Sequence, residues 1–142
     1  QMGYRSDVAY RIMFKNKTVL NEFIALVMVK GEYVAKALKE CEIEQGYQDT
    51  YYVNFFQSDV KWYDEFPDVQ GHEELYKFAV ERFPDDAGYR FVRIGEENDD
   101  IEEHEEGGID LIPYEDFYIR SEISLPFSHN YRAVGDTLAL IP

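Results

Sequence analysis

The segment DVAYRIMF, residues 7–14, decides the fold class. Its apolar side chains recur at every second position: Val8, Tyr10, Ile12 and Phe14. Because successive side chains of a β-strand point to opposite faces of a sheet, this alternation predicts a strand with one face on the core. The rest of the domain is therefore expected to assemble around a sheet.

Two helices are predicted after this strand. Asn16 or Thr18 can cap the first one, because a side-chain oxygen there accepts hydrogen bonds from the free N–H groups of the first turn. Apolar residues then recur at helical spacing: Leu20, Phe23, Ile24 and Val27. Gly31 ends this helix, and a second apolar stripe predicts another short helix at 32–41.

The middle of the chain predicts a second strand and a third helix. Residues 50–63 are rich in aromatic and β-branched side chains, which favours a long strand, bulged near Ser58 and Asp59. The third helix is expected to begin at Pro67, since proline is tolerated in the first turn of a helix. Alternation of apolar residues predicts two more strands, at 88–95 and 116–125.

The predicted element order is β-α-α-β-α-β-β. Such an order is typical of an α+β domain, here a mainly antiparallel four-stranded sheet with helices on one face. The length of 142 residues agrees with one domain. We expect this domain to span 2–127, with an acidic loop at 96–116 between two paired strands and a C-terminal tail at 128–142.

Negative charge dominates the composition. The formal net charge is −15, and eleven Asp and Glu residues lie between Arg93 and Arg120. This charge argues against a protein that contacts nucleic-acid phosphates directly, because such proteins need a basic surface. It argues equally against binding to an anionic membrane. A cationic protein partner or a divalent ion is favoured instead.

Cysteine content and hydropathy bear on location. Cys41 is the single cysteine, so no intrachain disulfide is expected, and its acidic neighbours disfavour a reactive thiolate. The longest apolar stretch, at 23–29, is shorter than the roughly 20 residues needed to span a bilayer. No signal peptide is recognisable, so the cytoplasm is the expected location.

Residues 58–76 interleave aromatic and acidic side chains, a pattern typical of protein interfaces. The predicted partner-binding residues there are Trp62, Tyr63, Asp64, Glu65 and Asp68. A second, electrostatic set lies in the acidic loop: Glu96, Glu97, Asp99, Asp100, Glu102 and Glu103. As an alternative, Trp62 and Phe66 are core residues at a strand–helix junction, which leaves Tyr63 as the better surface candidate.

Signs of enzymatic chemistry are weak. No nucleophile elbow, phosphate-binding loop or dinucleotide fingerprint occurs, and neither a cofactor nor a catalytic residue is assigned. The segment ENDDIEEHEEGG, residues 97–108, does not follow the EF-hand pattern, although a loose divalent ion could gather at Glu102, Glu103, His104, Glu105 and Glu106. His72 falls on an apolar helix stripe and is interpreted as structural. The leading enzymatic alternative is a metal-dependent phosphoesterase or nuclease, with candidate ligands Asp7, Asp59 and Asp64.

Four segments carry a resemblance to a known group of proteins. They are YRSDVAYRIMFK (4–15), VKWYDEFPDVQ (60–70), YRFVRIGEENDDIEE (89–103) and FYIRSEIS (117–124). Their order resembles that of a family of small acidic proteins of tailed bacteriophages, over residues 4 to 124. The resemblance implies a phage origin and the host cytoplasm, but it implies no activity and no role for any residue.

The sequence thus predicts a non-enzymatic acidic binding module that engages a basic host or phage protein, such as a nucleic-acid-binding or defence protein, with nucleic-acid mimicry as one mode. By analogy alone, small acidic phage proteins often act in this way. Besides the metal-dependent enzyme, a self-assembling structural accessory protein is an open alternative, with a homodimer as its simplest form.

Overall fold

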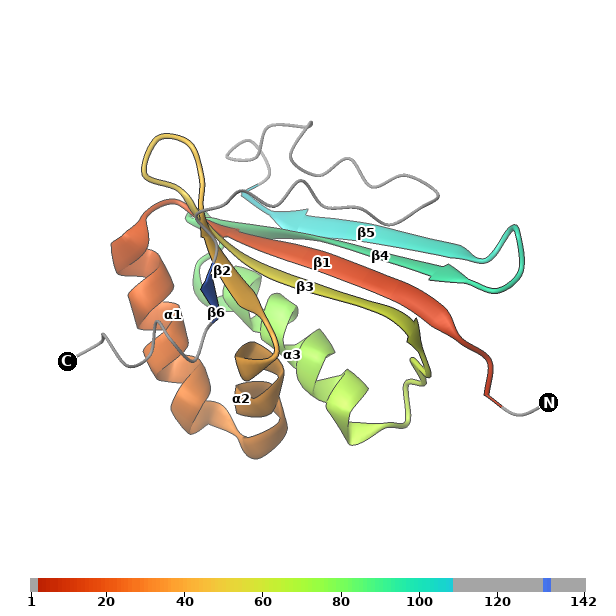
Figure 1. The fold of residues 1–142 in the computed structure, drawn as a ribbon. Coiled ribbons are helices and arrows are strands. Elements are labelled where there is room, and N and C mark those ends of the chain that lie inside the picture. Colours follow the sequence, from red (N-terminus) through yellow and green to blue (C-terminus); the bar gives the residue numbers. More distant parts are fainter. Residues whose placement is uncertain (1–2, 109–131, 134–142) are drawn as a thin grey trace.

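The computed structural model describes residues 3–108 and 132–133, and it has an α+β architecture (Figure 1). Its helices are α1 (Lys17–Lys30), α2 (Glu32–Lys39) and α3 (Pro67–Arg82). Its strands are β1 (Ser6–Phe14), β2 (Glu42–Gln45), β3 (Tyr51–Val60), β4 (Ala87–Gly95), β5 (Ile101–Gly107) and β6 (Arg132–Ala133).

The strands form one sheet in the order β5-β4-β1-β3-β2-β6, and every described pairing is antiparallel. The three helices cover one face of this sheet (Figure 1). The predicted class, the antiparallel pairing and the one-sided helices are therefore confirmed. The predicted count of four strands is too low, because β2, β5 and the two-residue β6 were not expected. The predicted strand 116–125 and most of the tail 128–142 lie outside the described residues.

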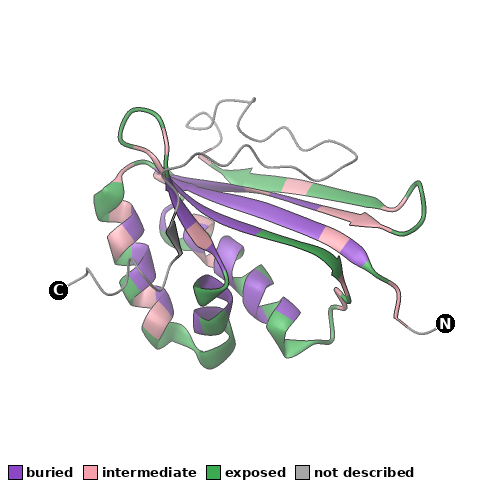
Figure 2. Cartoon of the chain, in the orientation of Figure 1, coloured by how far each residue is buried: buried purple, intermediate pink, exposed green. Residues whose placement is uncertain are grey.

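β1 is the central element of the core. Its predicted apolar face packs under the helices, where the apolar stripe of α1 meets it: Leu20, Phe23, Ile24 and Val27 are all buried. The other face of β1 is buried as well, through Ala9, Arg11 and Met13 (Figure 2). The alternation in the sequence correctly located the strand, but it did not reveal that both faces are covered.

Arg11 is the largest fully buried side chain of β1. Its Nη2 atom lies 2.8 Å from Oε1 of Glu44 on β2, and its Nε donates to Oδ1 of Asn54 on β3 at 2.8 Å. The guanidinium also lies 4.1 Å from the ring centroid of Tyr52. Burying a charge is costly unless it is paired and hydrogen-bonded, so this network ties β2 to the centre of the sheet.

Local signals explain where the helices begin and where β3 bends. The Asn16 side chain accepts a hydrogen bond from Val19 N–H at 3.0 Å, so the predicted cap of α1 is confirmed. The predicted bulge is also present: Asp59 has φ of +55°, and the β1–β3 register shifts opposite it. Its N–H donates to Oδ1 of Asp7 at 2.9 Å. The chain then leaves the sheet and enters α3 at Pro67.

The acidic segment is the main departure from the predicted fold. Residues 101–107 are not loop but strand β5, which pairs along the edge of β4. The connection is the short turn 96–100, in which Gly95 N–H donates to the carbonyl oxygen of Asp100 at 2.8 Å. Four glutamates in one strand would repel one another, but Arg90 and Arg93 of β4 face them across the ladder, and opposite charges there are stabilising.

Candidate functional site: an acidic cleft

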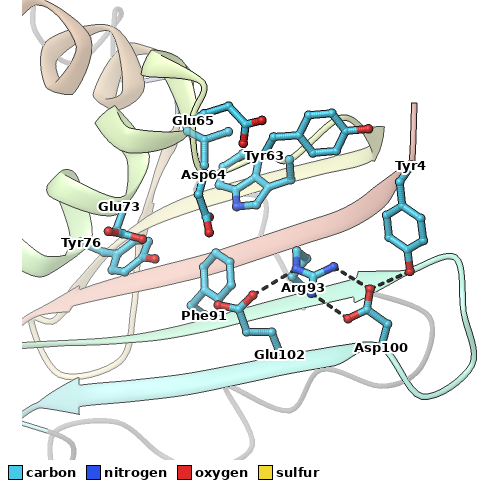
Figure 3. A pocket seen from close by; sticks show the side chains of 12 residues that line it. Tyr4, Tyr63, Asp64, Glu65, Glu73, Tyr76, Phe91, Arg93, Asp100 and Glu102 are labelled. Carbon is cyan, nitrogen blue, oxygen red and sulfur yellow. Dashed lines mark hydrogen bonds and ion pairs between the residues drawn. The ribbon is translucent and has the colours of Figure 1, made fainter. Parts of the chain in front are cut away.

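A cleft lies where the chain between β3 and α3 faces the outer part of the sheet (Figure 3). We call it the acidic cleft. Its aromatic lining residues are Tyr4, Trp62, Tyr63, Tyr76 and Phe91. Its carboxylates are Asp64, Glu65, Glu73, Asp100 and Glu102, and Val69 and Arg93 complete the lining. The lining is therefore aromatic and strongly acidic, and it is drawn from five separate parts of the chain.

Aromatic rings make up the inner part of the cleft. Phe91 of β4 is buried and stacks on His104 of β5, with 4.7 Å between ring centroids. The ring centroid of Tyr76 lies 5.4 Å from that of Phe91, and the centroid of Trp62 lies 6.4 Å from it on the other side. Trp62 also packs on Phe55 of the core, at 5.8 Å. These contacts hold the rings in place before any ligand arrives, which lowers the entropy cost of binding.

Among the described residues, Arg93 is the one cation in the lining, and its guanidinium is fully engaged. Nη2 lies 2.7 Å from Oδ1 of Asp100, Nη1 lies 3.0 Å from Oδ2 of the same carboxylate, and Nε lies 3.1 Å from Oε1 of Glu102. Nη1 also donates to Ser6 Oγ at 3.1 Å. The Tyr4 hydroxyl donates to Asp100 Oδ2 at 2.6 Å. Figure 3 shows the bonds among Arg93, Asp100, Glu102 and Tyr4 at one end of the cleft.

This arrangement sets the electrostatics. The Arg93 guanidinium, helped by the Tyr4 hydroxyl, lowers the pKa of Asp100 to about 2, and hydrogen bonding to Asp100 raises the pKa of Arg93. Both groups stay charged at neutral pH. Five carboxylates and one guanidinium leave the lining with a formal charge of −4. The cleft therefore attracts cations and repels anions.

Asp64 and Glu65 provide the carboxylates that remain available. Both side chains are exposed, and neither makes an ion pair within the described part of the chain. Their segment is nevertheless ordered: Gln70 Nε2 donates to the carbonyl oxygen of Asp64 at 2.9 Å, and Phe66 N–H donates to that of Tyr63 at 2.9 Å. The backbone thus holds two unpaired carboxylates at the mouth of the cleft.

The structure brings together six residues from the two predicted partner-binding sets. Trp62, Tyr63, Asp64 and Glu65 line the cleft with Asp100 and Glu102. Trp62 is half-buried against the core while it lines the cleft, so both predictions for it hold in part. Tyr63 is half-buried as well, whereas Phe66 is 38% exposed and is not a core residue.

Five predicted residues do not line the cleft. Asp68 instead pairs with Lys36 of α2, with 3.0 Å between Oδ1 and Nζ. Glu103 lies on the opposite face of the sheet from Glu102, where it faces Arg90 at 3.5 Å. The remaining three lie in the turn before β5: Glu96, Glu97 and Asp99. A continuous acidic run in the sequence is therefore divided between two faces, because a strand alternates its side chains.

Six lining residues were not among the predicted partner-binding residues, although Glu73 and Tyr76 belong to the stretch 58–76 that suggested an interface: Tyr4, Val69, Glu73, Tyr76, Phe91 and Arg93. Tyr76 and Val69 lie on the apolar stripe of α3, and such a stripe predicts residues that pack in the core. Arg93 lies at the start of the acidic run. Its pairing with Asp100 and Glu102 requires the β4–β5 hairpin, which was not predicted because the segment is so acidic. No local pattern links these positions.

A second polar cluster is centred on the buried His72 and reaches the surface at Glu40. Nδ1 of His72 lies 2.6 Å from the Tyr10 hydroxyl, and Nε2 lies 2.7 Å from Oε1 of Glu40. His72 is 2% exposed, in agreement with its prediction as a structural residue. Burial raises the pKa of Cys41 to about 12 and raises that of Tyr10. The thiol next to this cluster is therefore neutral and unreactive.

The metal-site alternative finds no support in the geometry. Nowhere in residues 3–108 and 132–133 do three His, Cys, Asp or Glu side chains converge as metal ligands would. Of its candidate ligands, Asp7 and Asp59 are neighbours through the β3 bulge, whereas Asp64 lies in the acidic cleft. Within the same residues, no helix has the length and hydropathy to cross a membrane.

Comparison with known proteins gave no match: no protein-family model fits the chain, and no curated protein or solved structure is significantly similar to it. The family resemblance noted from the four sequence segments is therefore neither supported nor contradicted by these comparisons. The acidic cleft, through its geometry and charge, is the feature of the protein that bears on function.

Proposed function

We propose that this protein is a non-enzymatic acidic binding module whose acidic cleft docks onto a basic surface of another protein. One observation carries the proposal: two acidic segments far apart in the sequence meet around a wall of aromatic rings, and the only cation that the described residues contribute to the lining is already paired. We further propose, from the resemblance to phage proteins, that the module is phage-encoded and acts in the host cytoplasm.

The aromatic and the acidic residues of the cleft are expected to contribute to binding in different ways. Buried aromatic residues such as Trp62 provide most of the binding free energy when a partner covers them. Exposed carboxylates such as Asp64 and Glu65 chiefly raise the association rate of a basic partner and its salt sensitivity. Nucleic-acid mimicry would need carboxylates spread along the surface. The carboxylates of the acidic cleft gather at one site, which favours docking of a basic protein segment.

Charge reversal at the mouth of the cleft tests the proposal. The variant Asp64→Lys, Glu65→Lys changes two exposed side chains that have no ion-pair partner in the described structure. The matched control Glu81→Lys, Asp85→Lys makes the same change in net charge near the C-terminal end of α3, away from the cleft. Both variants and the parent protein are used in pull-downs from bacterial lysate at low and high salt.

We expect a basic partner that the parent protein and the control both retain at low salt, and that the Asp64, Glu65 variant loses. High salt should release this partner, because it screens charges beyond about 3 Å at 1 M. Equal retention by both variants, or a partner that survives high salt, would contradict the proposal.

A further inference from the structure

Tyr76 occupies an unusual position at the inner end of the acidic cleft. Its side chain is 2% exposed, and its ring is packed by Tyr89 at 4.5 Å and by Tyr10 at 5.2 Å between centroids. The hydroxyl nevertheless has no hydrogen-bond partner in the described part of the chain. Buried tyrosine hydroxyls usually have a partner, because leaving one unpaired costs about 1–3 kcal/mol.

The surroundings of this hydroxyl indicate what would pair with it. Figure 3 shows it pointing toward the space between Asp64 and Glu102, with Glu73 beside it. Burial raises the pKa of Tyr76, and these carboxylates raise it further, Glu73 most. The hydroxyl therefore stays neutral, with its oxygen lone pairs available. A ligand that carries several N–H donors and a positive charge would satisfy the oxygen and the carboxylates together.

We propose that the acidic cleft binds one arginine side chain of the partner protein, whose guanidinium lies against the aromatic wall and donates to Tyr76 Oη and to the carboxylates. This inference deepens the proposed function and rests on it. The aromatic wall consists of Trp62 and Phe91, and the acceptors nearest the hydroxyl are Asp64, Glu73 and Glu102.

Arginine fits this cleft better than other cations do. A guanidinium is planar, stacks on aromatic faces and has five N–H donors, whereas a lysine ammonium is a compact and strongly hydrated charge. Carboxylates of the cleft already hold one guanidinium, since Arg93 is fixed by Asp100 and Glu102 at the other end. A phosphate or carboxylate ligand would meet described lining residues whose formal charge is −4 and whose one cation, Arg93, is already paired.

Trp62 makes the test direct, because it is the only tryptophan in the chain and it lines the cleft. The full-length protein is titrated with the blocked peptide acetyl-Gly-Arg-Gly-amide, and Trp62 emission is recorded. The same peptide with lysine, or with citrulline as the neutral isostere of arginine, serves as the comparison. Spermidine tests a free polyamine as the source of the positive charge.

We expect a saturable change in emission with the arginine peptide, weaker binding of the lysine peptide and no saturation with citrulline. Tyr76→Phe keeps the ring and removes only the unpaired hydroxyl, so the fold should persist while arginine-peptide affinity falls about tenfold, as for loss of a hydrogen bond to a charged group. The matched control is Tyr47→Phe, which alters an exposed tyrosine in the turn between β2 and β3 and should leave affinity unchanged.

Three results would overturn the inference: no saturable change with the arginine peptide, equal affinity for citrulline, or parental affinity in Tyr76→Phe. Tighter binding of spermidine than of the peptide would overturn the assignment to a protein side chain. The experiments distinguish failure of the arginine site from failure of the acidic binding module. If the lysate partner is lost on charge reversal at Asp64 and Glu65 but kept by Tyr76→Phe, the binding module stands and the arginine site does not.

Discussion

Replacing Gly71 with alanine is expected to destabilise the protein, although alanine is the better helix former. Gly71 lies within α3 where this helix crosses the start of α2. A Cβ atom at this position would lie 2.4 Å from the carbonyl oxygen of Tyr33 and 2.7 Å from its carbonyl carbon. Ordinary contacts of a Cβ begin near 3.4 Å, so the two helices would have to separate by about 1 Å.

The size of the effect follows from two opposing contributions. Overpacking costs about 1–3 kcal/mol, and the upper end applies here because the obstructing atoms belong to the backbone of α2 and cannot rotate away. Alanine regains about 1 kcal/mol through its helix propensity. The free energy of unfolding of Gly71→Ala should therefore fall by about 2 kcal/mol relative to the parent protein.

Urea unfolding, followed by Trp62 fluorescence and by helical circular dichroism, measures this change. Glu74 supplies the control: it is exposed on the same helix, and its pairing with Lys30 is lost equally in Glu74→Ala and Glu74→Gly. Alanine should be more stable than glycine there by about 1 kcal/mol. The preference should reverse at position 71. A Gly71→Ala protein as stable as the parent, or more stable, would refute the close approach of α2 and α3.

Two further predictions concern charged groups. Arg93 and Tyr4 lower the pKa of Asp100 to about 2. The ionised carboxylate therefore stabilises the fold above its ordinary pKa of 3.8, and this stabilisation is lost as pH falls through about 2. In thermal melts, the melting temperatures of Asp100→Asn and the parent should differ at pH 5 and converge near pH 2. Glu44→Ala removes the carboxylate that lies 2.8 Å from the buried guanidinium of Arg11 and should cost about 3 kcal/mol in urea unfolding, more than the replacement of both residues by methionine.

Hydrophobic periodicity accounts for the elements that were predicted correctly. β1, the helices α1 to α3, the bulged β3 and β4 all carry a repeat of 2.0 or 3.6 residues, and such a repeat reports which side of an element is buried. The cap at Asn16 and the helix start at Pro67 depend only on neighbouring backbone groups. These features are local, so the residues nearby in the sequence are sufficient to determine them.

β2 and β5 were not predicted, and the reason is the same for both strands. Both are rich in glutamate, which isolated strands disfavour, and both are stabilised by arginines on other strands. Glu44 of β2 is paired with Arg11 of β1, and the glutamates of β5 face Arg90 and Arg93 of β4. Ion pairs with a neighbouring strand offset the low strand propensity of these glutamates, and such pairs cannot be recognised from the local sequence.

The sequence by itself determined the fold class, the central strand and the aromatic and acidic character of the two segments that matter. Contacts between elements decided that these segments meet and that Asp100 and Glu102 enter the cleft while Glu103 does not. They also place the Tyr76 hydroxyl at the inner end of the cleft, without a hydrogen-bond partner among the described residues. The physical reason is that a strand places neighbouring residues on opposite faces, whereas packing places distant residues together, so the site depends on register and on contacts between elements.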